Sequence, residues 1–498
     1  MQTKIIIRDI IVTGVLAVLI VIPEWGAARD NVLTVGLGTG VDYSDREYSE
    51  PDIEAVADDD YNRIFVTPLV QLVSTTPRDS IELRAAPWIS YDTDESETEW
   101  NSDFYAAAMR HMTREWQVEI SNAFLISDYY RTDTIEGISG ETDEIEAIDL
   151  ADPELDPNQG RERYWRNTLT LASDYTYGQD SLWGVDLSYI ALRYDDDEFS
   201  DDDYDRYLVG LRNQHRYSAA WDSEASLRFI RGDFEEIDPD VATGIIEGIA
   251  PEADIELTDD DLSRDLREYR FYGAINNHSF DHNVLSAAYN FIGARYDETL
   301  RDDIDINQVR FTWERDFTEH LNTTLGIGPS YQKVENRDGE WAGNGIAGLN
   351  YTGRRSTTGV SLEKRYDIDS FSGTGELGFT DAWIGRFDYT QQMLRSLSVR
   401  ANLYWFYEDR EDPVYGAEQI LEEIAAGGDV SGISLEEAEE YHRDTFLAGL
   451  GLDYTFMQNY TASLSYFFTK RESDQEADNY DEHRVLFQLS WRADVMRW

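Results

Sequence analysis

Apolar and polar residues alternate in segments of about ten residues over most of the chain, and this alternation predicts β-strands. In 32–43, Leu33, Val35 and Leu37 share one face, because successive side chains of a strand point to opposite sides. One face of each predicted strand is apolar, and the other is polar or small. The same alternation recurs in 165–173, 309–314, 397–405 and 485–491.

The connections between predicted strands are of two kinds, short turns and long acidic loops. Outer-membrane barrels have tight periplasmic turns and longer external loops, and an even strand number places both chain ends in the periplasm. We therefore predict an all-β fold, a transmembrane antiparallel up-and-down β-barrel of about 20 strands (roughly 18 to 22). Predicted short turns include 75–80, 178–181, 316–320, 353–356 and 457–459, and predicted long loops include 44–60, 131–162, 235–265 and 408–441.

Aromatic residues gather at the ends of the predicted strands. Rings with a polar atom settle at the level of the lipid headgroups. The aromatic ends and the loop asymmetry therefore favour apolar faces that contact lipid and polar faces that line a wet interior. These aromatic residues are Trp88, Tyr91, Tyr129, Tyr130, Tyr175, Tyr177, Trp405, Tyr407, Tyr454 and Phe456.

The chain ends in Trp498, and outer-membrane barrels commonly finish with an aromatic residue. Trp498 occupies an even position, whereas Val485, Phe487 and Leu489 share the odd positions of the last predicted strand. A β-bulge or a strand end after Trp491 would reconcile the two phases.

The N-terminus has the features of an export signal. Lys4 and Arg8 precede an apolar run over 10–22, and small residues follow at 26–28. The apolar run is too short to span a bilayer as a helix. We predict a cleaved signal peptide over 1–28 and a barrel over 29–498, located in the outer membrane of a Gram-negative bacterium. An uncleaved membrane anchor is the alternative.

The net charge of −58 argues against nucleic acid as a partner, because phosphate binding needs a basic face. The charge fits solvated acidic loops in a saline habitat, or divalent-cation binding at the outer surface. The nearest approach to a calcium loop is Asp303, Asp305 and Asn307, where Gln308 replaces the required glycine.

Catalytic and cofactor signals are missing from the sequence. There is no cysteine, no Gly-x-Ser-x-Gly elbow, no His-Glu-x-x-His and no phosphate loop of the form Gly-x-x-x-x-Gly-Lys-Ser/Thr. His278 and His282 are close enough in sequence to reach one metal ion, but exposed turn histidines are the better interpretation without further ligands. We predict no cofactor and no enzymatic activity.

Charged residues lie on the polar faces of several predicted strands. They are expected to point into the lumen, because charge facing lipid near the midplane is costly. A network of paired charges that keeps the wall polar and an ion-selectivity element are both open interpretations. The predicted pore-lining residues are Arg166, Arg206, Arg212, Arg228, Arg270, Arg310, Arg400, Glu314, Glu363 and Glu376.

Two stretches carry a family resemblance. Residues 76–83 (Thr-Pro-Arg-Asp-Ser-Ile-Glu-Leu) are followed by Pro87 and Tyr91, and 164–171 (Tyr-Trp-Arg-Asn-Thr-Leu-Thr-Leu) are followed by Tyr175. Together they resemble outer-membrane β-barrel porins often found with exopolysaccharide or exosortase gene clusters. The resemblance is strongest over the N-terminal part of the mature chain. It implies an outer-membrane barrel with porin activity or a role in polysaccharide export.

The predicted function is passive transport through an outer-membrane pore, either of small solutes or of an exported exopolysaccharide. A barrel of about 20 strands should be open, since roughly 16 to 18 strands already leave an aqueous channel. A structural or binding barrel that acts through its acidic loops is the alternative, and an outer-membrane enzyme is a distant third. Expected partners are membrane lipid and lipopolysaccharide, the barrel assembly machinery and, from the resemblance, polysaccharide export components.

Overall fold

A computed structural model describes the barrel strands and the turns between them. The predicted signal peptide, Glu376, Tyr129 and Tyr130 lie outside the described residues, as does most of each predicted long loop. Among the described residues, no helix is long and apolar enough to cross a membrane. The described residues are 29–48, 60–94, 96–127, 163–194, 203–234, 265–296, 303–335, 339–369, 378–411, 440–473 and 479–498.

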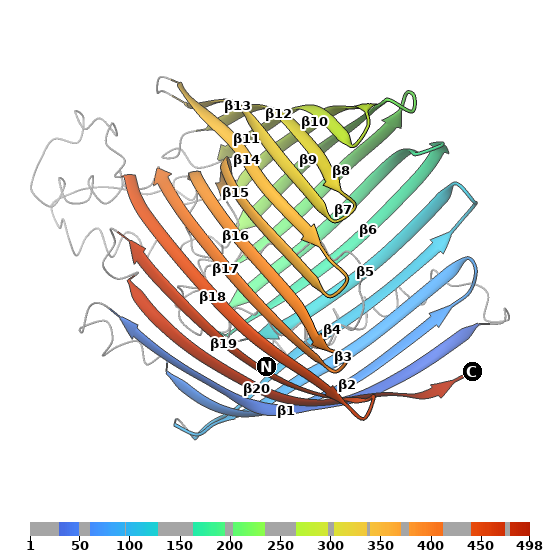
Figure 1. The fold of residues 1–498 in the computed structure, drawn as a ribbon, viewed down its shortest axis with the longest axis vertical. Helices are drawn as coiled ribbons and strands as arrows, with labels where there is room; N and C mark the ends of the chain where they lie inside the picture. Colours follow the sequence, from blue (N-terminus) through green and yellow to red (C-terminus); the bar gives the residue numbers. More distant parts are fainter. Residues whose placement is uncertain are drawn as a thin grey trace, which may run out of the picture.

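The predicted fold class is confirmed: 20 antiparallel strands form one sheet that closes on itself between the first and last strands. The strands are strongly tilted, so those of the near wall cross those of the far wall in Figure 1. The strands are β1 (Asp30–Tyr48), β2 (Tyr61–Thr75), β3 (Asp79–Asp92), β4 (Thr98–His111), β5 (Trp116–Ser127), β6 (Tyr164–Gly178), β7 (Ser181–Tyr194), β8 (Tyr204–Arg216), β9 (Trp221–Phe234), β10 (Leu266–Phe280), β11 (Asn283–Tyr296), β12 (Ile304–Thr318), β13 (Leu321–Val334), β14 (Glu340–Thr352), β15 (Ser356–Asp369), β16 (Gly378–Leu394), β17 (Leu397–Glu411), β18 (Glu440–Phe456), β19 (Tyr460–Ser473) and β20 (Tyr480–Arg497).

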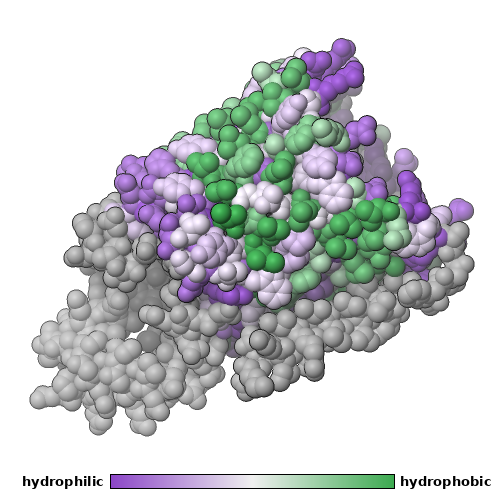
Figure 2. Space-filling view, turned by 90° about the horizontal axis from the view of Figure 1, so that it is seen from below, coloured by the Kyte–Doolittle hydropathy of each residue, from purple (hydrophilic) through white to green (hydrophobic). Residues whose placement is uncertain are grey.

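The two faces of the wall have the predicted polarity. On β1, Leu37 and Val41 are exposed on the outer face, whereas Asp42, Ser44 and Arg46 are buried on the inner face. The space-filling view in Figure 2 shows a hydrophobic band on the outer surface between hydrophilic margins. This distribution suits a wall with lipid outside and polar groups inside.

Aromatic girdles border the apolar band, as predicted, but Trp88 does not belong to them. Its ring is buried on the inner face and stacks on Phe65 with centroids 4.1 Å apart. The position of Trp88 near a strand end did not show whether its ring points outward or into the lumen. Exposed outward rings near the loop end include Tyr43, Tyr91, Trp100, Tyr207 and Tyr269, and those near the turn end include Trp116, Tyr175, Trp183, Trp221, Tyr351 and Tyr454.

A β-bulge lies where β20 closes against β1. Thr34 is opposite Asp494, but Leu33 is opposite Met496, so β20 has one extra residue. Beyond the bulge, Asn31 and Trp498 exchange backbone hydrogen bonds of 2.9 and 3.1 Å. The extra residue brings Trp498 onto the outer face, which resolves its phase difference.

Among the described residues, an Asp or Asn that immediately precedes the second strand fastens five hairpins at their loop ends. Its side-chain oxygen accepts a hydrogen bond from a backbone N–H near the end of the preceding strand. Asp303 serves this role and also pairs with Arg295, so it closes a hairpin. The bonds are Arg46 N to Asp60 (2.7 Å), Tyr194 N to Asp203 (2.7 Å), Phe234 N to Asp265 (3.0 Å), Tyr296 N to Asp303 (3.2 Å) and Ser473 N to Asn479.

The wall overlaps itself between β14 and β15, a feature that we call the overlap seam. These strands pair only as far as Gly345 and Lys364, and the rest of β15 enters the lumen. There Gln308 Nε2 donates to the Tyr366 carbonyl at 2.7 Å, and an Arg270 guanidinium nitrogen donates to the Ile368 carbonyl at 3.2 Å. Side chains of β12 and β10 thus replace part of the missing backbone ladder.

An apolar cluster lies on the inner face beneath the loop end of β6–β12. Tyr366 and Ile368 of β15 pack in the same cluster, which fixes the overlap seam by burial as well as by hydrogen bonds. The cluster also contains Tyr164, Ile190, Leu192, Tyr204, Ile230, Leu266, Ile292, Ala294, Tyr296, Ile304 and Ile306.

Candidate functional site

The inner face of the barrel is the candidate site, because its polar groups face the enclosed space. The strand registers place nine of the ten predicted pore-lining residues on the inner face. The tenth, Glu376, lies outside the described residues. Their contribution to ion selection stays a prediction. The nine on the inner face are Arg166, Arg206, Arg212, Arg228, Arg270, Arg310, Arg400, Glu314 and Glu363.

Four of these arginines form ion pairs within the wall. Arg212 contacts the carboxylates of Asp186 and Asp174 at 2.6 and 2.9 Å. The other three pairs join Arg310 to Glu363 (2.8 Å), Arg400 to Asp453 (3.0 Å) and Arg270 to Asp367 (3.3 Å). Arg270 also contacts Glu268. These contacts favour the paired-charge interpretation for these four side chains.

Arg228 and Glu314 differ from the paired arginines. Neither forms an ion pair or a hydrogen bond within the described part of the chain. Arg228 is exposed and lies directly opposite Arg270 in the β9–β10 register, where like charges repel. Arg166 and Arg206 each have an interaction partner. Arg228 and Glu314 are therefore the predicted residues best placed to act on a passing ion.

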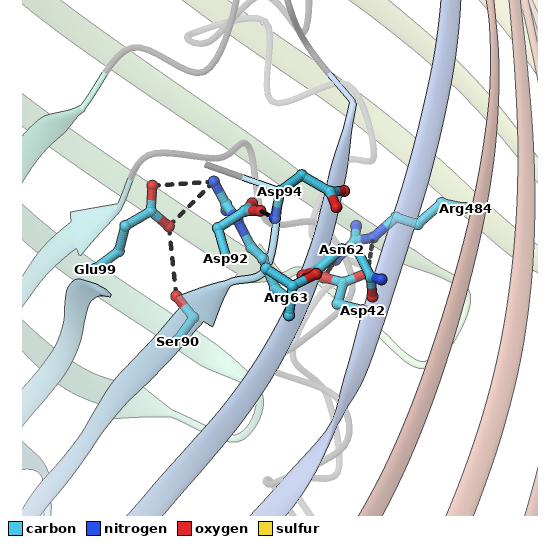
Figure 3. A network of polar contacts seen from close by, with 9 residues as sticks. Asp42, Asn62, Arg63, Ser90, Asp92, Asp94, Glu99 and Arg484 are labelled. Carbon is cyan, nitrogen blue, oxygen red and sulfur yellow. Dashed lines mark hydrogen bonds and ion pairs between the residues drawn. The ribbon is translucent and has the colours of Figure 1, made fainter. Parts of the chain in front are cut away.

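The sequence did not reveal a second set of inner-face charges near the closing strands. Arg484 of β20 donates two hydrogen bonds, of 2.9 and 2.8 Å, to Asp42 of β1. Arg63 of β2 contacts Asp92 at 3.3 Å and Glu99 at 3.0 Å. Figure 3 shows these side chains reaching toward one another across neighbouring strands. Their partners are far apart in sequence, so strand alternation alone could not pair them.

A polar chamber of about 550 Å³ is hollowed into the inner face of β9–β12 and reaches β14 and β15. It brings together three predicted residues, Arg310, Glu314 and Glu363, and its other lining residues were not predicted. The lining comprises Glu224, Tyr272, Asn276, His278, Val284, Ser286, Ala288, Asn290, Gln308, Arg310, Thr312, Glu314, Asn344, Glu363, Arg365, Tyr366 and Asp367.

Small side chains explain why the chamber is hollow. Ser286 and Ala288 of β11 alternate toward the lumen and form the part of the lining that we call the floor, with Ala274 of β10 opposite Ala288 in the register. Longer side chains surround this floor, and Tyr366 and Asp367 cover it from the overlap seam. The chamber therefore depends on β15 leaving the line of the wall.

Hydrogen bonds hold several chamber side chains in place. Tyr272 Oη donates to Glu224 at 2.9 Å, and Arg310 Nε donates to Asn344 Oδ1 at 3.0 Å. The Asn344 amide donates to Ser330 Oγ at 2.9 Å and to the Pro329 carbonyl at 3.1 Å. Such bonds fix rotamers before any ligand arrives.

Histidine and carboxylates line the chamber, and among the described residues no group of three or more His, Asp or Glu is arranged to hold a metal ion. His278 contacts Asp222 instead. His282 lies in the β10–β11 turn with a positive φ of 61°. His278 lies within β10, two residues before the end of the strand, so the predicted turn position holds for His282 and not for His278.

No protein-family model and no curated protein matches this chain. Among solved structures, it is similar to the FrpB iron transporter of Neisseria meningitidis, with 6% identity, a TM-score of 0.50, and coverage of 93% of this chain and 82% of that one. It is also similar to the siderophore receptor PirA of Pseudomonas aeruginosa, with 9% identity, a TM-score of 0.47, and coverage of 92% and 80%. At these identities the likeness shows the fold alone.

The closed sheet, its apolar outer band and its aromatic girdles establish the predicted location. The protein is an outer-membrane β-barrel of a Gram-negative bacterium. The comparisons offer nothing on the exopolysaccharide gene clusters, so that part of the resemblance stays a prediction.

Proposed function

We propose that the protein is a passive outer-membrane pore for small polar solutes. The observation that carries the proposal is the polarity of the wall: charged and amide side chains line the inner face, and apolar side chains cover the outer face. Sheets of roughly 16 to 18 strands already enclose an aqueous channel when closed. The ion pairs keep the wall polar while leaving its local charge nearly balanced, which suits small solutes of either sign.

Planar-bilayer recording tests the pore. Purified full-length protein should produce discrete conductance steps in symmetrical KCl. Folded protein is identified beforehand by its strand-rich circular dichroism and by slower mobility in unheated gel samples. Folded protein that inserts without any conductance would overturn the proposal and favour the structural or binding barrel.

Charge in the lumen should set ion preference. Replacing Arg166, Arg270 and Arg310 together with Gln leaves nearby carboxylates such as Glu363 and Asp367 without their cations, so the lumen becomes more acidic. The reversal potential in a salt gradient should shift toward cation preference. Charges inside a lumen are screened less than exposed loop charges, so the shift should persist at high salt.

The double variant Arg310→Gln with Glu363→Gln is the matched control. It removes an ion pair without changing the net charge of the lumen. Its reversal potential should stay near that of the wild type. An equal shift in both variants would mean that altered packing, and not charge, is being measured.

Export of an exopolysaccharide is the alternative function, which the sequence resemblance implies. Deletion of the gene would then remove a surface glycan while leaving small-solute uptake unchanged. Contacts with lipopolysaccharide, the assembly machinery and export components are likewise proposals. Crosslinking in whole cells tests them.

A further inference from the structure

We propose that the polar chamber is a binding site for a small uncharged ligand rich in hydroxyl groups, such as a mono- or disaccharide. The proposal rests on the proposed pore, because the ligand would reach the chamber through the lumen. It goes further by naming a substrate class and a place where that class is held.

The size and shape of the chamber suit such a ligand. Its volume of about 550 Å³ lies within the range of roughly 300 to 1,000 Å³ typical of small-molecule sites. The floor at Ser286 and Ala288 lets a ring lie close to the wall. Tyr366 and Asp367 approach from the overlap seam, so the chamber has walls on more than one side.

The chemistry of the rim favours hydroxyl groups. A hydroxyl donates one hydrogen bond and accepts others, so it needs donors and acceptors mixed at short range. The chamber provides amides at Asn276, Asn290 and Gln308, together with the hydroxyls of Ser286 and Thr312. A mixed set of this kind satisfies a polyol more completely than it satisfies a group that only donates or only accepts.

The charges of the chamber argue against a strongly anionic ligand. Glu224, Glu314, Glu363 and Asp367 line it alongside Arg310 and Arg365. Arg310 is already held by Glu363, and Arg365 has an interaction partner. An anion would therefore meet carboxylates without a free guanidinium to bind it.

Preorganisation gives the site its selectivity. Tyr272 is fixed by Glu224, and Arg310 is fixed by both Glu363 and Asn344. A ligand that bonds to these side chains does not have to order them, which lowers the entropic cost of binding. Glu314 has no partner within the described residues, so its carboxylate oxygens are available as acceptors.

Current block in a planar bilayer tests the site. Maltose and N-acetylglucosamine are the neutral probes, and glucosamine and glucuronate are the cationic and anionic comparisons. At least one neutral probe should reduce the single-channel current in a saturable way, at lower concentration than glucuronate, because the carboxylates of the chamber repel an anion. Block by glucosamine or glucuronate alone, or no saturable block, would overturn the proposal.

Two variants locate the binding. Ser286→Trp places an indole ring on the floor, where the sugar would lie. It should weaken neutral-sugar block by at least about tenfold, which corresponds to about 1.4 kcal/mol of binding free energy. Asn290→Ala removes one rim amide without adding bulk and should weaken it in the same direction. Ser188→Trp, on the inner face of β7 outside the chamber, is the matched control and should leave block unchanged. Equal loss in Ser286→Trp and Ser188→Trp would overturn the assignment to this chamber.

The experiments distinguish a failure of the binding site from a failure of the proposed pore. A wild-type protein that conducts but shows no saturable neutral-sugar block contradicts the site and leaves the pore intact. If the protein does not conduct, titration calorimetry of folded full-length protein in detergent decides the site alone. Heat of binding for a neutral probe that Ser286→Trp abolishes supports the proposal, and its absence overturns it.

Discussion

Substituting Arg for Leu169 or Leu403 is expected to destabilise the folded barrel far more than substituting Arg for its inner-face neighbour. Leu169 lies on the outer face of β6, and Leu403 is 43% exposed on the outer face of β17. An Arg that faces lipid near the midplane costs roughly 2 to 4 kcal/mol. Thr168 and Asn402 point into the lumen, where water and carboxylates accept a guanidinium.

Urea titration of protein refolded into lipid vesicles measures this difference. Leu169→Arg and Leu403→Arg should lower the free energy of unfolding by the stated amount, while Thr168→Arg and Asn402→Arg should change it little. Similar losses in the outer-face and inner-face variants would mean that the faces are assigned wrongly.

Removing the Asp42 carboxylate is expected to have the second large effect. Its bidentate pair with Arg484 joins β1 to β20, and both side chains are nearly inaccessible, at 5% and 6% exposure. Asp42→Ala leaves the Arg484 guanidinium buried without this partner, and breaking a buried pair from one side costs about 3 to 5 kcal/mol. The same urea titration should register the loss as a lower free energy of unfolding.

The ion pair between Asp30 and Arg497 is the matched comparison. It joins the same two strands at 2.7 Å, but its side chains are 50% and 71% exposed. Asp30→Ala should therefore change stability little, because exposed pairs contribute little. The double variant Asp42→Leu with Arg484→Leu should recover much of the loss, because no charge is left buried alone. A double variant as unstable as Asp42→Ala would show that packing, and not the unpaired charge, causes the loss.

The sequence predicted the barrel because alternation is local. Leu33, Val35 and Leu37 reveal an apolar face without any knowledge of neighbouring strands. The same alternation placed Arg212 and Arg310 on the inner face. It could not show that Arg212 meets Asp174 and Asp186, because those contacts depend on the registers of three strands.

The polar chamber and the overlap seam were not predicted, since both depend on a local departure from the regular wall. The sequence of the adjacent strands β13 and β14 carries one signal of this departure: Pro329 with Gly326, Gly328, Gly343 and Gly345. A strand proline cannot donate to its ladder, and strand glycines often mark a bend or a close approach of backbones. A glycine-rich pair of strands with a proline therefore indicates an irregular part of the wall.

The overlap seam gives this closed barrel a short free edge. Within the described residues, Glu340 to Asn344 pair with β13 but not with β15. Unpaired edges invite another strand to add to the sheet, and barrels ordinarily escape this hazard by closing. Here closure leaves this short stretch unpaired. The stretch begins at the charged Glu340, and the space beside Gly343 is open. Strand addition by a second chain is therefore confined to this short stretch, with a charged residue at its outer end to oppose it.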